Sequence, residues 1–298
     1  MKITITGSLG HISKPLTQQL VSAGHAVTVI SSKLERTKEI EEMGATSAIG
    51  SLEDVDFLST AFNGADAVYT MVPPGNYFDP EFDLLAYYKK LGSNYAKAIK
   101  ESNIKHVANL STIGAHLEKG SGILLGAHNV EKILNELPVD VAITHIRPTS
   151  FFYNLYGYTD MIKNQNMIAA NYGEEDIIPW VSPKDIATAI AEELTNSFSG
   201  RKVRYVVSDE RSGNDTASVL GKAIGKPDLK WVLVTDKQTL DGLVAIGMNP
   251  KIAAGLVEMY ASLHTGLLAE DYYLNKPEKM GKVKLEEFAK EFAMTFNK

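Results

Sequence analysis

The sequence contains no cysteine among its 298 residues. This absence excludes disulfide bonds, thiolate nucleophiles and cysteine-ligated zinc sites. It is compatible with a reducing compartment, where proteins rarely rely on disulfide bonds. We expect no metal site elsewhere in the chain.

Positive charge is also in short supply, with 30 Lys and Arg residues against 36 Asp and Glu residues and a formal net charge of −6. The basic residues are scattered along the chain. We therefore expect no direct contact with nucleic acid, because phosphates require a surplus of cations on one face.

Long hydrophobic runs are missing as well. A membrane-spanning helix needs about 20 consecutive apolar residues. The first residues also lack the apolar core of a secretory signal. We therefore expect a cytoplasmic protein that makes no membrane contact.

The first half of the chain alternates short apolar strands with amphipathic helices. Strands are predicted at 2–6, 26–30, 46–49, 65–72, 105–110 and 139–146. Between them, five helices are predicted. They lie at 12–23, from the end of the second strand to about residue 43, at 52–62, from the cap Asp79-Pro80 to about 102, and at 127–137. This order predicts an α/β protein with a doubly wound parallel sheet over residues 1–150.

The alternation ends beyond Pro148. Ser182-Pro183-Lys184-Asp185 reads as a capping box that starts a helix to about Leu194, and 203–207 reads as a strand, so we expect 180–207 to return to the sheet. Helical patterns follow at 214–224, 236–246, 250–270 and 284–296. Residues 151–179 and 208–298 are expected to form a smaller, mainly helical lobe that covers one edge of the sheet and contributes to substrate binding.

The strongest local motif is Thr6-Gly7-Ser8-Leu9-Gly10-His11-Ile12-Ser13, which follows a strand and opens a helix. In that context Gly7 permits a tight turn and Gly10 lets the backbone approach a pyrophosphate held at the helix N-terminus. Ser13 stands where a third glycine is usual and is small enough for close packing. Gly7, Leu9, Gly10, His11 and Ile12 are therefore predicted cofactor contacts, the alternative being a turn that merely uses glycines.

The residues at the end of the second predicted strand indicate whether NAD(H) or NADP(H) binds. Sites selective for NAD place an acidic residue there to accept from the ribose 2′-hydroxyl. Here Ser32 and Glu35 have capping-box spacing, which assigns Glu35 to the helix start. Ser31, Ser32, Lys33 and Arg36 would instead face a 2′-phosphate, so NADP(H) is preferred over NAD(H). The alternative is a solvated helix start with ordinary surface cations.

Ligands of an open parallel sheet lie at the carboxyl ends of its strands. Small polar groups and turn residues follow three of the predicted strands. The cofactor contacts predicted there are Met71, Val72, Pro73, Ser111, Thr112 and Pro148. Pro73-Pro74 would serve equally well as a rigid turn without a ligand.

Several motifs in order resemble the NmrA-like group of the atypical short-chain dehydrogenases/reductases. They are Thr6-Gly7-x-x-Gly10 and the segments 105–112, 128–134, 146–155 and 180–187. The resemblance spans about 210 residues and, more loosely, the tail. It implies a Rossmann fold in a group that includes NADPH-dependent quinone reductases and redox-sensing regulators.

The main groups of that superfamily use a Ser and a Tyr-x-x-x-Lys pair. Here Ser111 or Thr112 stands in the place of the serine, and the helix reads His128-x-x-x-Lys132 without the tyrosine. The resemblance makes His128 a candidate proton donor and Lys132 a partner for the ribose or the acceptor carbonyl. On pattern alone, His128, Glu131, Lys132 and Asn135 form the polar stripe of an amphipathic helix that faces water.

Phe151, Phe152 and Tyr153 belong to an aromatic cluster that would suit a flat apolar substrate. The function predicted from these residues is an NADP(H)-binding oxidoreductase that transfers hydride to a small quinone or carbonyl substrate. The alternative is a non-catalytic NADP(H)-sensing regulator that acts through a protein partner, with homodimerisation left open. Sugar-nucleotide epimerisation ranks last, because it depends on the missing tyrosine.

Overall fold

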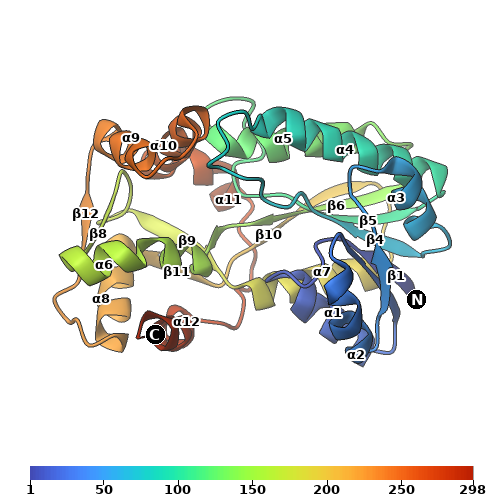
Figure 1. Cartoon of the computed structure of the whole chain (residues 1–298), viewed down its shortest axis with the longest axis horizontal. Helices are drawn as coiled ribbons and strands as arrows, with labels where there is room; N and C mark the ends of the chain where they lie inside the picture. Colours follow the sequence, from blue (N-terminus) through green and yellow to red (C-terminus); the bar gives the residue numbers. More distant parts are fainter. Residues whose placement is uncertain (298) are drawn as a thin grey trace.

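The computed structural model of the chain describes residues 1–297, and its centre is a seven-stranded parallel sheet (Figure 1). The strands are β1 (Lys2–Ile5), β2 (Ala26–Ser31), β3 (Thr46–Ile49), β4 (Ala67–Thr70), β5 (His106–Leu110), β6 (Ala142–Pro148) and β10 (Arg201–Val206). Their order is β10-β6-β5-β4-β1-β2-β3. The winding reverses between β1 and β4, which confirms the predicted doubly wound sheet and places its switch point there.

Helices cover both faces of this sheet. One face carries α1 (Ser13–Ser22) and α7 (Pro183–Thr195), and the other carries α3 (Val55–Phe62), α4 (Leu84–Glu101) and α5 (Leu125–Asn135). The short helices η1 (Leu34–Arg36) and α2 (Thr37–Glu42) join β2 to β3. Alternate strand residues serve the two faces, since in β4 Ala67 and Tyr69 pack on the α1 side and Val68 packs on the α4 side. Burial on both faces explains the nearly continuous apolar strands.

The second lobe has sheets of its own, which the sequence did not predict. Its strands are β7 (Ser150–Phe151), β8 (Met167–Ala170), β9 (Ile177–Val181), β11 (Asp209–Ser212) and β12 (Lys230–Leu233). Its helices are η3 (Phe152–Tyr158), α6 (Thr159–Gln165), α8 (Gly213–Ala223), α9 (Asp236–Ala245), α10 (Pro250–His264), η4 (Leu267–Ala269), α11 (Glu270–Leu274) and α12 (Leu285–Phe296). A separate aromatic core that includes Phe152, Trp180 and Trp231 holds the lobe together.

Two predicted helix boundaries change markedly, and one predicted capping box is absent. The fourth helix begins at Leu84 with Asp83 as its cap, and not at Asp79-Pro80. The helix predicted over 250–270 ends at His264, ahead of Gly266 in the left-handed region. Ser182 does cap α7, but Asp185 accepts from Ser208 and from the backbone of Val283 rather than completing a capping box.

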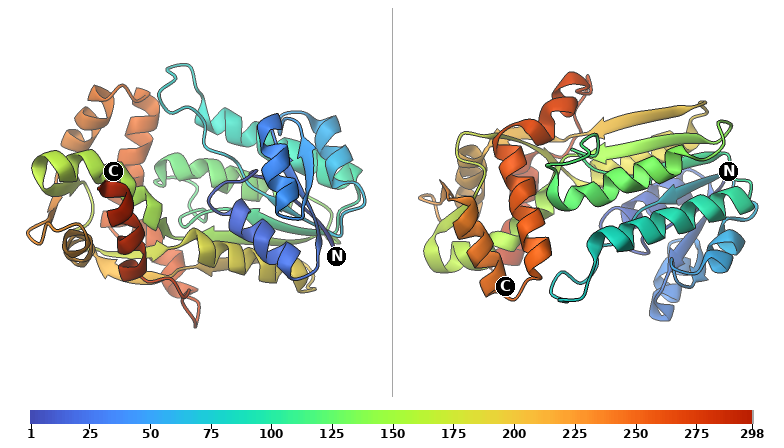
Figure 2. Two further views of the ribbon diagram at one scale, coloured as in Figure 1. Left: turned by 60° about the horizontal axis from the view of Figure 1, so that its bottom comes forward. Right: turned by 90° about the horizontal axis from the view of Figure 1, so that it is seen from above.

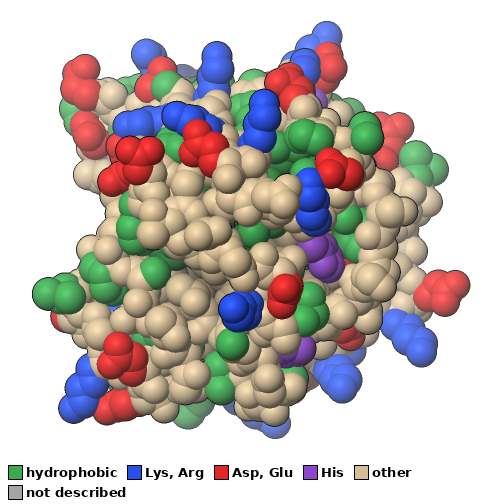
Figure 3. Space-filling view, turned by 90° about the vertical axis from the view of Figure 1, so that its right-hand side faces the viewer, with side chains coloured by type: hydrophobic (Ala, Val, Ile, Leu, Met, Phe, Trp, Pro, Cys, Tyr) green, Lys and Arg blue, Asp and Glu red, His purple; other side chains and the backbone are tan. Residues whose placement is uncertain are grey.

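The outer surface mixes charges of both signs. On the face in Figure 3, acidic and basic side chains are interspersed. Among residues 1–297 no single helix is long and apolar enough to cross a membrane, although the bent pair Pro250–His264 and Leu267–Leu274 passes the length and composition test when taken together.

The second lobe reaches back to the sheet through α10. In both views of Figure 2, the orange α9–α10 pair lies at the end of the molecule opposite the N-terminus. The β5–α5 loop meets α10 at Gly122 of η2 (Gly122–Leu124), which has φ of 54° and leaves no room for a Cβ beside the Gly255 carbonyl oxygen. A glycine is therefore required where the backbones of the loop and the lobe touch.

Gly122→Ala is expected to destabilise the protein by several times the cost of Gly64→Ala in urea unfolding. Both glycines have positive φ, at 54° and 76°, but a Cβ on Gly64 meets nothing within 4 Å. Gly64→Ala should therefore lose only the left-handed backbone preference, about 1 kcal/mol. Equal losses in the two variants would show that the loop and α10 do not depend on this contact.

Candidate functional site

The glycine loop forms a tight turn between β1 and α1 at the switch point of the sheet. Gly7 has φ of 87°, and a Cβ there would overlap the Ser13 hydroxyl. Ser13 is buried, and its Oγ donates to the Thr6 carbonyl oxygen at 2.9 Å. The serine in the third glycine position thus fastens α1 to β1 and preserves the close packing.

The start of α1 leaves backbone donors for a ligand. Within residues 1–297, the N–H groups of His11, Ile12 and Ser13 donate to no protein acceptor, and no side chain caps the helix. Unsatisfied N–H groups and the positive end of the helix dipole bind an anion such as a phosphate. Because Gly7 and Gly10 also carry no side chain that would keep a ligand from the backbone, this segment fits the pyrophosphate of a dinucleotide.

The end of β2 lies against the same loop. Ser8 Oγ donates to Ser31 Oγ at 2.9 Å, and Ser31 Oγ accepts from the Lys33 N–H at 3.1 Å. The capping box predicted for Ser32 and Glu35 is wrong, because η1 follows Lys33 and has no side-chain cap. Ser32 and Glu35 are both exposed, so neither is committed to the helix start.

The two predicted cations at this end differ in their surroundings. Arg36 donates to Glu39 at 2.9 Å, and Lys14 donates to the other oxygen of the same carboxylate at 2.7 Å. Hydrogen bonds from Lys14 and Arg36 lower the pKa of Glu39. Lys33 is exposed and forms no ion pair among the described residues. Lys33 is therefore the cation more readily available to a 2′-phosphate.

The end of β4 is tied to the glycine loop. The Met71 N–H donates to Thr6 Oγ1 at 3.0 Å, and Tyr95 of α4 donates to the Met71 carbonyl oxygen at 2.6 Å. Met71, Val72 and Pro73 are all half-buried. The predicted contacts that follow β4 thus lie in a fixed position beside Gly7, whose nearest neighbours include the Met71 side chain.

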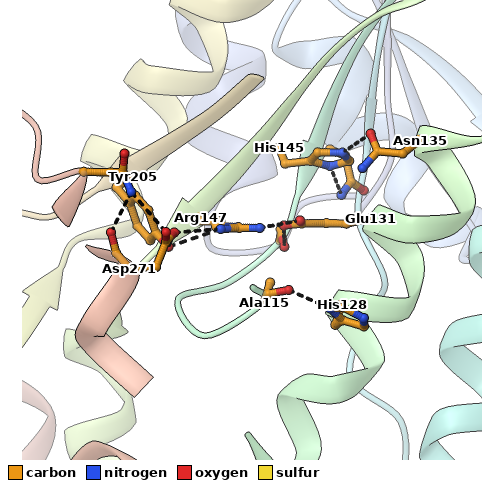
Figure 4. Close-up of polar contacts among 11 residues, drawn as sticks. Ala115, His128, Glu131, Asn135, His145, Arg147, Tyr205 and Asp271 are labelled. Atoms are coloured by element: carbon orange, nitrogen blue, oxygen red, sulfur yellow. Dashed lines mark hydrogen bonds and ion pairs between the residues drawn. The ribbon is translucent and has the colours of Figure 1, made fainter. Parts of the chain in front are cut away.

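A buried ion pair joins the end of β6 to α5, beside the end of β5 (Figure 4). Arg147 of β6 donates to Glu131 of α5 through Nε at 2.9 Å and Nη2 at 2.6 Å, and both side chains are only 8% exposed. The buried Ser111 hydroxyl donates to the same carboxylate. Ser111, predicted as a cofactor contact, thus points to Glu131, while Thr112 is half-buried and Pro148 lies within β6.

The same guanidinium contacts the second lobe. Arg147 Nη1 donates to Asp271 of α11 at 3.0 Å and to Tyr205 of β10 at 3.2 Å, and Tyr205 donates to Asp271. Burial lowers the pKa of Arg147, but the hydrogen bonds and charge of Glu131 outweigh burial and raise it above its usual value. Arg147 therefore stays charged and joins α5, β6, β10 and α11.

A second polar chain runs behind the ion pair. Thr70 donates to Asn109 at 3.0 Å, Asn109 lies 3.2 Å from His145 Nδ1, and His145 Nε2 lies 3.0 Å from Asn135 Oδ1. Burial lowers the pKa of His145. Glu131, Asn109, His145 and Arg147 were not predicted as functional residues, although polar side chains inside apolar strands were a usable signal.

The helix of the candidate catalytic pair does not present one continuous polar face. Glu131 is buried, so the predicted water-facing stripe of His128, Glu131, Lys132 and Asn135 is wrong at its centre. Lys132 and Asn135 are exposed, and His128 is half-buried. His128 Nδ1 lies 2.9 Å from the Ala115 carbonyl oxygen, which can only accept (Figure 4). Nδ1 therefore carries the hydrogen, and Nε2 is left for a ligand.

The aromatic residues after β6 divide into two groups. Tyr153 stacks on His11 of the glycine loop with ring centroids 4.8 Å apart, and on Phe151 at 4.9 Å. Phe152 is 1% exposed in the lobe core, where it stacks on Phe288. The prediction that Phe152 lines a substrate site is therefore wrong, whereas Phe151 and Tyr153 lie beside the glycine loop.

Arg147→Met is expected to lower the free energy of unfolding by about 3–5 kcal/mol, because Glu131 then keeps a buried charge without its partner. Adding Glu131→Leu should recover part of this loss in urea unfolding. Lys105→Met is the control, since its ion pair with Asp140 is half exposed and is worth less than about 1 kcal/mol. The account fails if Arg147→Met and Lys105→Met unfold alike.

Comparison with known proteins agrees with this arrangement. The NmrA-like family model matches residues 1–289. An NAD(P)H azoreductase from Xenophilus azovorans is 24% identical over 301 residues, with 99% of each chain covered. The NADPH complex of the NADPH-dependent quinone oxidoreductase from Escherichia coli is 18% identical, covers 97% of this chain and 99% of that one, and has a TM-score of 0.80.

A Citrobacter triphenylmethane reductase complexed with NADP(H) is 19% identical, with a TM-score of 0.76 and coverage of 98% of this chain and 99% of that one. At these identities the solved structures establish the Rossmann-like α/β fold. The family model covers nearly the whole sequence, from the glycine loop to the last helix. The chain therefore belongs to the NmrA-like family.

Proposed function

We propose that the chain is an NADP(H)-dependent reductase that transfers hydride to a small quinone or carbonyl compound. The observation that carries this proposal is the start of α1, where three backbone N–H groups and two glycines at the switch point form a place for a dinucleotide pyrophosphate. It is supported by the azoreductase, which is named for NAD(P)H, and by the two similar structures with bound NADPH or NADP(H).

The preference for NADP(H) rests on the end of β2. Lys33 is exposed there without an ion pair among residues 1–297, and Ser31 holds the Lys33 backbone in place. A lysine ammonium suits a phosphate as a point charge, whereas Arg36 is already engaged by Glu39. We assign Lys33 the leading part in recognition of the 2′-phosphate.

The protein positions the cofactor and the acceptor, and it supplies one proton. A bound reduced nicotinamide supplies the hydride. His128 has its Nδ1 held by the Ala115 carbonyl oxygen, so Nε2 is the nitrogen that would hold a proton for the acceptor oxygen. Lys132 is exposed one position after the buried Glu131 and would approach the ribose or the acceptor carbonyl. Ser111 has its hydroxyl hydrogen committed to Glu131.

Because the usual tyrosine acid is absent, acceptors that form a stable oxyanion on reduction are favoured as substrates. The tyrosine used as acid by most of the superfamily is replaced by His128 in this sequence. A reduced quinone tolerates a weak proton donor better than a ketone does. Phe151 and Tyr153 beside the glycine loop would stack on a flat ring. Burial raises the pKa of Tyr153 to about 12, so its hydroxyl stays protonated.

His128→Gln is expected to lower kcat for NADPH oxidation by about a hundredfold with a small aldehyde, and by less with a small quinone, because it removes the acid–base nitrogen. Glu136→Gln, near the exposed end of the same helix, should leave turnover unchanged. Unchanged turnover in His128→Gln would remove His128 from the mechanism. NADPH binding without reduction of any quinone or aldehyde would favour the sensing regulator instead.

Lys33→Ala is expected to raise the Kd for NADPH by about tenfold and to leave the Kd for NADH unchanged, which corresponds to the loss of one charge-assisted contact. Fluorescence titration with both reduced cofactors measures this. Lys38→Ala removes a similar exposed lysine from α2 and serves as the control. Tighter binding of NADH than of NADPH by the unaltered protein would contradict the preference.

A further inference from the structure

The segment Pro73–Asp83, between β4 and α4, forms a strap with no regular secondary structure. Its fold is set locally, because Asn76 Oδ1 accepts from the Phe78 N–H and Asp79 Oδ1 accepts from the Glu81 N–H. The Phe82 ring covers Gly75, where any Cβ would overlap it. The strap is therefore an ordered loop, and it begins at Pro73, the last of the predicted cofactor contacts Met71 to Pro73.

One residue of the second lobe holds this strap. Asn249, 3% exposed, donates through its backbone N–H to the Tyr77 carbonyl oxygen at 2.9 Å. Its Nδ2 donates to the carbonyl oxygens of Asp79 at 2.9 Å, Pro80 at 3.1 Å and Phe82 at 3.4 Å. Figure 2 shows the strap leaving the start of α4 towards the orange α9–α10 pair.

Asn249 has a second task in its own helix. Its Oδ1 accepts from the Lys251 N–H at 2.9 Å and caps the start of α10. The two ends of one amide group therefore serve two elements, the oxygen serving the helix and the nitrogen serving the strap. This division allows the two tasks to be separated by substitution.

The held strap carries Tyr77 into a group of tyrosines from other elements. Burial raises the pKa of Tyr153 after β6, of Tyr88 on α4 and of Tyr260 on α10, and each of these pKa values is raised further because Tyr77 lies near enough for its ionised form to repel theirs. Tyr153 itself stacks on His11 of the glycine loop. The Tyr88 ring packs against Gly126, two residues before His128. The strap thus brings Tyr77 near Tyr153, which lies beside the glycine loop, and near Tyr88, which packs on the helix of His128.

We propose that Asn249 is a positioning residue for the acceptor: it holds the strap so that Tyr77, with Tyr153, forms the surface on which a flat aromatic acceptor binds. The acceptor class is an uncharged aromatic ring with carbonyl oxygens, because protonated phenols pack on such rings and donate to such oxygens. This inference rests on the proposed function, since it concerns the acceptor of that reaction.

Two variants of Asn249 separate the strap from the helix cap. Asn249→Asp keeps an oxygen that caps α10 but loses the amide hydrogens donated to the strap, whereas Asn249→Ala loses both. Thr235→Ala removes the cap of α9, an exposed helix start whose side-chain hydrogen bonds go to Gln238 and not to the strap, and is the matched control. For each purified protein we would measure hydrogen exchange over residues 73–83, the Kd for NADPH, and kcat and KM with a small quinone.

Both Asn249 variants are expected to raise exchange in 73–83 and the KM for the quinone by about tenfold, as the loss of the strap bonds implies. The kcat and the Kd for NADPH should stay within about twofold of those of the unaltered protein, because the strap bonds touch neither His128 nor the glycine loop. Tyr77→Ala should raise the KM for the quinone similarly, without raising hydrogen exchange outside residues 73–83. Thr235→Ala should match the unaltered protein.

Two results would overturn the proposal. Asn249→Asp with unaltered exchange and KM would reduce Asn249 to a helix cap. Raised exchange with unaltered KM would show that the strap does not position the acceptor. Failure of the proposed function gives a different result, in which the unaltered protein binds NADPH and reduces no acceptor while exchange over 73–83 still responds to Asn249→Asp.

Discussion

The buried ion pairs of the Arg147 guanidinium with Glu131 and Asp271 join the sheet to the second lobe, and the arrangement of the two lobes depends on them. Arg147 lies at the end of β6 and bonds Glu131 on α5, Tyr205 on β10 and Asp271 on α11. A buried charge is tolerated only when its partners are held in place. The sheet, the helix that carries His128 and the C-terminal lobe therefore share one fixed point. The Ser111 hydroxyl donates to the same Glu131 carboxylate, so the end of β5 joins this cluster.

Besides Arg147, two further contacts join the second lobe to the loops that follow strands β4 and β5. Gly122 lets the β5–α5 loop touch the backbone of α10, and Asn249 at the start of α10 bonds the strap after β4. The loops that would contact a nicotinamide are thus held from outside the sheet. The quinone oxidoreductase and the triphenylmethane reductase, two similar structures named for different acceptors, share this fold.

Sequence patterns predicted the sheet and the glycine loop because both depend on neighbouring residues. The strand–loop–helix around Gly7 and the alternation of strands and helices are local signals. The lobe strands were missed because β8 pairs with β12, some sixty residues later. The buried position of Glu131 depends on Arg147, 16 residues later, and Arg147 in turn bonds Asp271, 124 residues beyond it in the chain. The helix start predicted at Asp79-Pro80 had the right local chemistry, but Asn249 takes the carbonyl oxygens that a helix there would use.

The central claim is that this fold holds a reduced nicotinamide and passes its hydride to an acceptor bound beside Tyr153. The most direct measurement is single-turnover decay of nicotinamide fluorescence after the NADPH-saturated protein is mixed with a small quinone, with NADPH carrying hydrogen or deuterium at the transferred position. The account predicts a decay that is slower by about two- to fourfold with deuterium when hydride transfer limits the rate. Bound NADPH whose fluorescence does not decay on mixing would contradict it.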